Sequence, residues 1–198
     1  VLGDVYKRQV LSLSLAQDGI INKLRSNLPD CSFPIRYTSL TAFNARYRQG
    51  RITATGSLVY TNVTEHVKIG DAPADFQRLA PSFTVSLQPW QEQLLFLRLM
   101  YKSTFRMPTF NDLYYYRLGN RSLRPEKANE YNMGITWSRS FSSFLNYLSV
   151  TVDGYYNDVT DKIVAFPTTY AWKMANYGKV HVTGMDATCL LYTSPSPR

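Results

Sequence analysis

The stretch FRMPTFNDLYYYRLGNRSLRPEKANEYN, residues 105–132, lies between two segments in which side chains alternate in character. Every second residue is bulky and apolar or aromatic in residues 95–101, and again in residues 131–137. Alternation with a period of two places each set of side chains on one face of a β-strand. The stretch itself contains Pro108 and Pro125, which cannot continue a central strand. The sequence therefore predicts a long loop between two strands, and long loops on a rigid sheet usually carry function.

The same alternation recurs along most of the chain. In residues 52–58, for example, Ile, Ala, Gly and Leu alternate with Thr, Thr and Ser. Gln49-Gly50 precedes this segment and is a tight-turn signal, which predicts a β-hairpin around it. The pattern predicts an all-β chain of about eight antiparallel strands, over residues 10–16, 37–48, 52–61, 81–88, 95–102, 131–138, 148–157 and 179–188. Longer loops are expected over 17–34, 64–79, 105–128 and 160–178.

Two architectures fit this pattern. In a transmembrane β-barrel, short turns lie at one end and long loops at the other, bulky side chains face lipid and polar ones line the lumen. Aromatic residues near strand ends would then form the girdles at the membrane surfaces, here Tyr60, Tyr101, Trp137 and Tyr156. An antiparallel sandwich, with its apolar face as a core, is the alternative. The length of the strands and the alternation of short and long connections favour an incomplete outer-membrane barrel.

Composition excludes several function classes. The formal net charge is +8, but Lys and Arg form no long unbroken block, so nucleic acid is not an expected partner. The chain has only two histidines, His66 and His181, and neither has metal-ligand spacing to another His or Cys. It has no Gly-rich phosphate loop and no GxSxG elbow. We therefore expect no catalytic residues, no metal, no cofactor and no enzymatic activity.

The two ends differ from the body of the chain. VLGDVYKRQ, residues 1–9, and CLLYTSPSPR, residues 189–198, match no pattern elsewhere and resemble translated sequencing-adapter DNA. The expected division is a non-native tail at 1–9, part of a barrel at 10–188 and a second non-native tail at 189–198. Excluding the second tail removes Cys189 and leaves Cys31 without a disulfide partner. The chain is then expected to be a fragment that lacks both natural termini.

Four motifs follow one another in the second half of the chain, and together they indicate a family. The residues are FRMPT at 105–109 with NDLY at 111–114, GNRSLRPE at 119–126 with EYNMG at 130–134, YYNDVTDKI at 155–163, and NYGKV at 176–180 with TGMD at 183–186. They resemble motifs in the barrel of TonB-dependent outer-membrane receptors, namely FRAPT with N-E/D-L-Y, GNPxLKPE with ExG, YYNDIKDLI, and N-x-G-x-x-x-x-G-x-E. Met107, Arg121 and Asp186 depart from the usual Ala, Pro and Glu. The resemblance covers about residues 95–188.

This resemblance implies a barrel of roughly 22 strands in the outer membrane of a Gram-negative bacterium, closed around a plug. Such receptors import a scarce, bulky nutrient: an iron-siderophore, cobalamin, haem or an oligosaccharide. The implied partners are that extracellular ligand, outer-membrane lipid, and the TonB-ExbB-ExbD complex, reached through a plug outside this sequence. A passive porin-type barrel and a secreted β-sandwich binding module remain as alternatives.

The candidate site residues divide into two groups. Proline stops strand pairing, and the charged residues can form ion pairs at the rim, so one group is assigned to loop architecture. Aromatic side chains offer contact area at low entropy cost, and Arg binds carboxylate or phosphate, so the other group is assigned to ligand contact. The architectural residues are Arg106, Pro108, Asn111, Asp112, Pro125 and Glu126; the ligand-contact residues are Tyr114, Tyr115, Tyr116, Arg117 and Asn120.

Overall fold

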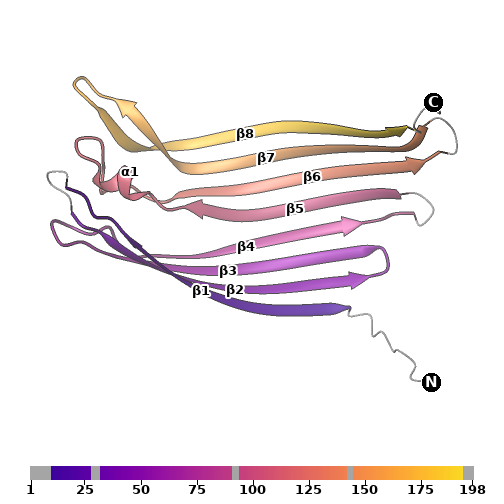
Figure 1. Cartoon of the computed structure of the whole chain (residues 1–198), viewed down its shortest axis with the longest axis horizontal. Coiled ribbons are helices and arrows are strands. Elements are labelled where there is room, and N and C mark those ends of the chain that lie inside the picture. Colours follow the sequence, from indigo (N-terminus) through magenta and orange to yellow (C-terminus); the bar gives the residue numbers. More distant parts are fainter. Residues whose placement is uncertain (1–9, 28–31, 91–93, 142–144, 194–198) are drawn as a thin grey trace, which may run out of the picture.

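A computed structural model describes residues 10–27, 32–90, 94–141 and 145–193. These residues form one sheet of eight antiparallel strands, in which each strand pairs with the next along the chain (Figure 1). The predicted all-β architecture and the number of strands are confirmed. The strands are β1 (Leu11–Lys23), β2 (Ile35–Gln49), β3 (Ile52–His66), β4 (Phe76–Leu87), β5 (Leu94–Arg106), β6 (Glu126–Ser140), β7 (Leu145–Pro167) and β8 (Trp172–Thr193), and one short helix, α1 (Phe110–Tyr114), lies between β5 and β6.

The two faces of the sheet differ sharply in chemistry. Along β6, Met133 and Ile135 lie on a face whose large apolar side chains are exposed, 61% and 44% respectively. The intervening positions face the other way and are polar. There Thr136 and Thr151 hydroxyls lie 3.1 Å apart, and Arg98 donates to Asp153 at 2.9 Å. We call these the apolar face and the polar face; they confirm the alternation read from the sequence.

Connections of different length lie at opposite ends of the sheet (Figure 1). The turn end holds the connections after β2, β4 and β6, which are short. The loop end holds those after β1, β3, β5 and β7, of which the loop 107–125 is the longest. We call this last segment the rim loop. The predicted asymmetry between short turns and long loops is therefore present in the connections after β1, β3 and β5, whereas the connection after β7 is only 168–171.

Three predicted loops are shorter than expected. β1 continues to Lys23, the connection after β3 spans only 67–75, and β7 and β8 extend until four residues, 168–171, join them. The predictions of loops over 17–34, 64–79 and 160–178 were therefore wrong in extent. In the added parts of these strands, polar and turn-type residues interrupt the apolar alternation. The sequence therefore indicated polar loops, although the backbone there is still paired.

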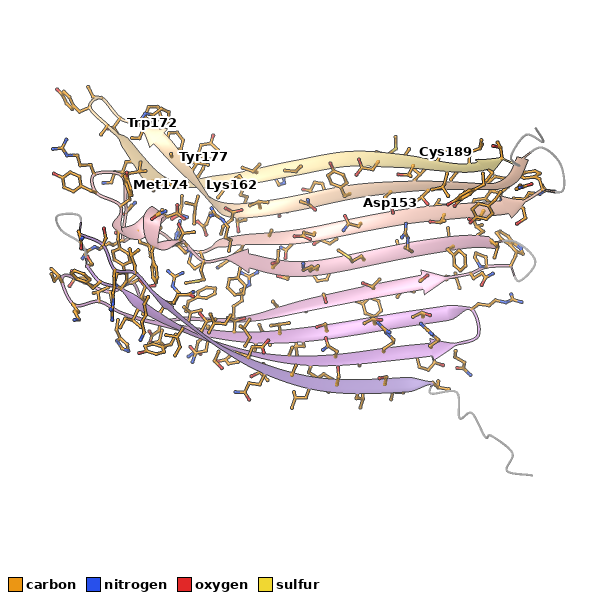
Figure 2. The ribbon with its side chains drawn as sticks, viewed as in Figure 1. Asp153, Lys162, Trp172, Met174, Tyr177 and Cys189 are labelled. Carbon is orange, nitrogen blue, oxygen red and sulfur yellow. The ribbon has the colours of Figure 1, made fainter. Side chains whose placement is uncertain are left out.

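Strand β8 also passes the expected boundary at residue 188. Cys189 pairs in register with Val150, and the ladder continues to Thr193. The free thiol of Cys189 is exposed near the turn end (Figure 2). The origin of residues 189–198 stays a prediction, and residues 1–9, 194–198 and Cys31 lie outside the described part of the chain.

Within that described part, no helix is long and apolar enough to cross a membrane.

Candidate functional site

The rim loop begins with a capped helix. Thr109 is the N-cap of α1, and its hydroxyl accepts a hydrogen bond from the backbone N–H of Asp112 at 3.2 Å. The Asp112 carboxylate accepts the N–H of Thr109 at 2.9 Å, which completes a capping box. Asn111 lies within this single turn, and its backbone carbonyl accepts the N–H of Tyr115 at 3.2 Å. Pro108 stands just before the cap, so the strand ends and the helix begins within three residues.

Arg106 joins the two ends of the rim loop. Its guanidinium lies 3.7 Å from the Asp112 carboxylate in α1 and 3.2 Å from the Glu126 carboxylate at the start of β6. Glu126 also accepts the backbone N–H of Ile163 at 3.2 Å and lies 3.7 Å from the ammonium of Lys162. The structure therefore brings Arg106, Asp112 and Glu126, three of the predicted architectural residues, into one cluster.

The environment of Glu126 also sets its charge state. Partial burial alone would raise the pKa of this carboxyl group. The hydrogen bonds from the Ile163 N–H and Arg106, together with the positive charges of Lys162 and Arg106, outweigh it, so the pKa is lowered. Glu126 is consequently ionised wherever the rim is near neutral pH, and it remains an acceptor for all of these donors.

A turn at Gly119-Asn120 fastens the rim loop to β8. The Asn120 carboxamide donates to the carbonyl of Met174 at 3.0 Å and accepts the N–H of Ser122 at 3.0 Å. The N–H of Met174 donates to the carbonyl of Leu118 at 2.9 Å, so the two segments run side by side. Gly119 lies so close to α1 that a Cβ there would be 2.6 Å from the carbonyl oxygen of Leu113. Asn120, predicted to contact ligand, thus has its amide engaged within the protein.

Asn176, which also belongs to β8, forms hydrogen bonds to the end of the rim loop. Its carboxamide oxygen accepts the N–H of Arg124 at 2.8 Å, and its amide nitrogen donates to the carbonyls of Arg124 and Asp161 at 2.9 and 2.8 Å. Arg124 also pairs with Asp161 at 2.8 Å. Pro125 follows directly and fixes φ where β6 begins. The GNRSLRPE and NYGKV motifs, distant in sequence, therefore meet at one point.

The inner side of the rim loop rests on a buried ion pair. Arg36 of β2 and Glu65 of β3 lie 2.7 Å apart with side chains only 9% and 5% exposed. The Tyr114 hydroxyl donates to Glu65, and the Arg36 guanidinium lies 4.9 Å above the Phe110 ring. Burial, followed by the hydrogen bond and negative charge of Glu65, raises the pKa of Tyr114. Tyr114, another predicted ligand contact, is thereby placed as an anchor of α1.

A small pocket lies beside this ion pair, beneath the rim loop. It has a volume of about 280 Å³, and its lining includes Arg36, Glu65, Leu113 and Arg121. Ligand pockets for drug-sized molecules typically measure about 300–1,000 Å³. The pocket is therefore slightly smaller than the pockets that typically enclose such molecules. No cluster of three or more His, Cys, Asp or Glu side chains able to hold a metal occurs among the described residues.

The tip of the rim loop is the part that faces outward. Tyr115 and Tyr116 are 53% and 44% exposed. Arg117 has a positive φ of 64°, and its guanidinium lies 5.0 Å above the Tyr116 ring. A bulky residue rarely adopts this left-handed conformation, and such strain concentrates at functional sites. These three predicted ligand-contact residues thus stay together and accessible.

The tip of the β7–β8 hairpin adds aromatic side chains that the sequence reading missed. Tyr170 is 98% exposed and Trp172 is 58% exposed. Figure 2 shows Trp172 and Met174 on the part of the hairpin that rises beside the rim loop. The bond between Leu118 and Met174 fixes that neighbourhood. The sequence did contain a signal, namely the two aromatic residues Tyr170 and Trp172, but they lay within residues 160–178, which were interpreted only as a loop.

Comparison with known proteins identifies the family. The family model described as TonB dependent receptor-like, beta-barrel matches residues 14–191. The chain belongs to this family. It is also 32% identical over 91 residues to the vitamin B12 transporter BtuB of Vibrio vulnificus (strain YJ016), a match that covers 45% of this chain and 14% of the relative. The chain thus spans a small part of the length of this relative.

Solved structures of TonB-dependent receptors share the fold. The FrpB iron transporter of Neisseria meningitidis superimposes with a TM-score of 0.62 at 16% identity, covering 82% of this chain and 24% of that one. A double mutant of the Serratia marcescens hemophore receptor HasR, in complex with its hemophore HasA and heme, gives a TM-score of 0.72 at 15% identity, with 92% and 38% covered. At these identities the likeness concerns the fold alone.

Family membership orients the sheet. TonB-dependent receptors are β-barrels of the Gram-negative outer membrane, so the apolar face is the lipid-facing face and the polar face lines the lumen. Because such barrels have short periplasmic turns and longer extracellular loops, the loop end is extracellular. The rim loop and the β7–β8 hairpin therefore lie on the extracellular side of the membrane.

Proposed function

We propose that this chain forms part of the wall of an energy-coupled outer-membrane receptor that imports a scarce, bulky nutrient. The observation that carries the proposal is an extracellular loop that is fastened to the wall at four places while its tip stays exposed. Among the proteins compared, BtuB is a vitamin B12 transporter, FrpB an iron transporter and HasR a receptor for a heme-carrying hemophore. The 32% identity to BtuB supports cobalamin as a nutrient class, while iron-siderophore, haem and oligosaccharide are the other classes that the sequence resemblance suggests.

The contact surface in this proposal is the exposed tip of the rim loop together with the hairpin beside it. Tyr115, Tyr116 and Arg117 supply two rings and a cation, and Trp172 adds a third ring. Rigid aromatic side chains bind with little loss of conformational entropy. Tyr114 and Asn120 act indirectly, because their hydrogen bonds to Glu65 and Met174 hold the tip in place.

Energy coupling would involve parts of the receptor beyond this sequence. In the proposed mechanism the polar face contacts a plug inside the barrel, and the plug transmits ligand occupancy to TonB-ExbB-ExbD. The Arg98–Asp153 pair and the Thr136–Thr151 contact provide polar surface for such a plug. The proposal assigns transport and not catalysis to the chain. A passive porin would share the wall but need no TonB.

The test is uptake by the full-length receptor in cells with and without TonB. Labelled cyanocobalamin, a ferric siderophore, haem and a maltooligosaccharide are offered in turn, and one is expected to enter only when TonB is present. A Tyr115→Ala/Tyr116→Ala/Arg117→Ala variant should reduce that uptake at least roughly tenfold, since each aromatic or cationic side chain at such a surface is worth about 0.5–2 kcal/mol. Tyr47→Ala, an exposed tyrosine near the turn end of β2 and far from the contact surface, is the control and should leave uptake unchanged. Uptake that is independent of TonB would instead identify a passive channel.

A further inference from the structure

The lipid-facing face carries a hollow that nutrient transport does not use. Its volume is about 560 Å³, twice that of the pocket beneath the rim loop. Its walls come from β4 to β7 and include Phe83, Leu99 and Met133. Phe83 is opposite Tyr101 and Leu99 is opposite Met133 in the strand registers, so these side chains share the lipid-facing face. We call this hollow the lipid-side groove.

A row of three tyrosines closes the extracellular end of the lipid-side groove. Tyr101, Tyr131 and Tyr156 are consecutive partners in register, with ring centroids 5.2 and 6.2 Å apart. The Tyr101 hydroxyl donates to Asn129 at 3.4 Å, and the Tyr156 hydroxyl lies 2.9 Å from His181 Nδ1. Tyrosines with an apolar ring and a hydrogen-bonded polar tip concentrate at the membrane–water interface. The row therefore marks the outer surface of the bilayer.

The position of the groove follows from this row. On the same face of β6, Trp137 lies six residues from Tyr131, a distance of about 20 Å along the strand. That approaches the height of about 25 Å typical of the apolar band on such barrels. Leu99 and Met133 are two residues below the tyrosines, toward the turn end. The lipid-side groove thus begins directly under the interface and lies in the outer leaflet.

A glycine accounts for the hollow. Gly154 lines the groove and pairs with Met133 on one side and Met185 on the other. An ideal Cβ at Gly154 would be 4.0 Å from its nearest neighbour, the carbonyl oxygen of Met133. A larger side chain therefore has room there, and its absence leaves a furrow between two long methionines that are 61% and 74% exposed.

We propose that the lipid-side groove holds one acyl chain of an outer-leaflet lipid, with the lipid headgroup beside the tyrosine row. The bilayer covers this face, so lipid is the molecule in contact with the groove. Water has no reason to occupy it, because ordered water needs two to four polar partners and the lining is almost wholly apolar. An extended acyl chain fits a furrow that begins below the tyrosine row and runs toward the turn end along the lipid-facing face. The inference does not depend on which nutrient the receptor imports.

The test maps lipid contacts on the full-length receptor. The receptor is reconstituted in vesicles with a phosphatidylethanolamine that carries a diazirine in one acyl chain, irradiated, and digested for mass spectrometry. Adducts are expected to concentrate at residues 131–133 and 154–156. Adducts spread evenly over the lipid-facing face, including Leu13 and Leu15, would overturn the proposal.

A matched pair of variants sharpens the result. Gly154→Leu fills the furrow and should reduce labelling at residues 131–133 severalfold, because the leucine side chain occupies the space in which the acyl chain packs. The displaced methylene groups move into other lipid, so the loss comes from packing contacts and not from exposure to water. Ala45→Leu adds bulk on the same face of β2, outside the groove, and should leave that labelling unchanged. Equal labelling in the two variants would refute the groove as a lipid site. If Gly154→Leu does not assemble, the distribution of adducts on the wild-type receptor decides the question alone.

Discussion

The carboxamide of Asn176 holds the backbone of Arg124 on both of its polar sides. Its oxygen accepts the Arg124 N–H at 2.8 Å and its nitrogen donates to the Arg124 carbonyl at 2.9 Å, across a separation of 52 residues. The same nitrogen reaches the Asp161 carbonyl at 2.8 Å. One side chain of β8 thus satisfies the backbone hydrogen-bonding groups at the end of the rim loop. It also binds the carbonyl of Asp161 in β7, a residue with a positive φ of 55°.

Replacing Asn176 with Ala should therefore loosen the rim loop. Three hydrogen bonds disappear, and at about 1 kcal/mol each the expected loss of stability is about 2–3 kcal/mol. The measurement is limited proteolysis of the full-length receptor, with cleavage expected in residues 107–125. Asn44→Ala serves as control, because Asn44 makes an exposed 3.4 Å contact to Ser14. Equal protease resistance of the two variants would contradict the assigned role.

Glu126 should make the stability of the folded protein fall as the pH is lowered into the acid range. Its folded pKa is lowered from the ordinary 4.5, so its contribution is fully present above that value and is lost as the pH falls through the folded pKa. Glu126→Gln should cost about 1–2 kcal/mol at pH 7 and progressively less below pH 4.5. Thermal unfolding of both proteins between pH 7 and 3 checks this. Gln17→Ala, which changes a side chain without an ionisable group on exposed β1, is the control and should show no such convergence.

Two glycines should respond very differently to a methyl group. At Gly119 the added Cβ would meet backbone atoms of Leu113 and Tyr115 at 2.6–2.8 Å, and backbone cannot rotate away. At Gly178 it would meet nothing within 4 Å. We expect Gly119→Ala to destabilise the rim loop by about 1–3 kcal/mol and Gly178→Ala to be close to neutral. Melting temperatures of the two variants provide the comparison, and a neutral Gly119→Ala would show that the turn at 119–120 is not tightly packed.

The buried Arg36–Glu65 pair under α1 should lose more stability when one charge is removed than when both are removed. Glu65→Leu leaves the Arg36 guanidinium buried without its partner and should cost about 3–5 kcal/mol. The double variant Arg36→Met/Glu65→Leu removes both charges and should recover most of that loss. Chemical denaturation of the four proteins of this double-mutant cycle measures the coupling. Additive losses in the double variant would show that the two charges do not stabilise each other.

Arg117 should separate ligand contact from loop stability. Asn tolerates the left-handed conformation better than Arg, so Arg117→Asn should leave stability unchanged or increase it by up to about 1 kcal/mol. It also removes the cation above Tyr116, so uptake of the imported nutrient should fall. Both quantities are measured on the same variant, by thermal unfolding and by uptake. Undiminished uptake would exclude Arg117 from the contact surface.

Local patterns in the sequence were sufficient for the strands that cross the membrane. In residues 95–101 and 131–137 one face must be apolar because it contacts lipid, so the alternation is visible in the sequence itself. The capping box of Thr109 and Asp112 is equally local, since its partners are three residues apart. The resemblance of four motifs, with this alternation, was enough to indicate the family that comparison then established.

Only the tertiary structure decided which residues of the rim loop hold it and which are free. Tyr114, Tyr115 and Tyr116 are identical in sequence terms, yet the first reaches Glu65 while the others remain exposed. Trp172 came beside the loop because Met174 pairs with Leu118. These outcomes depend on contacts between residues about 50 positions apart, and strand pairing sets them. No pattern within a short window of sequence encodes such contacts, because the free energy that selects them arises only when distant segments are packed together.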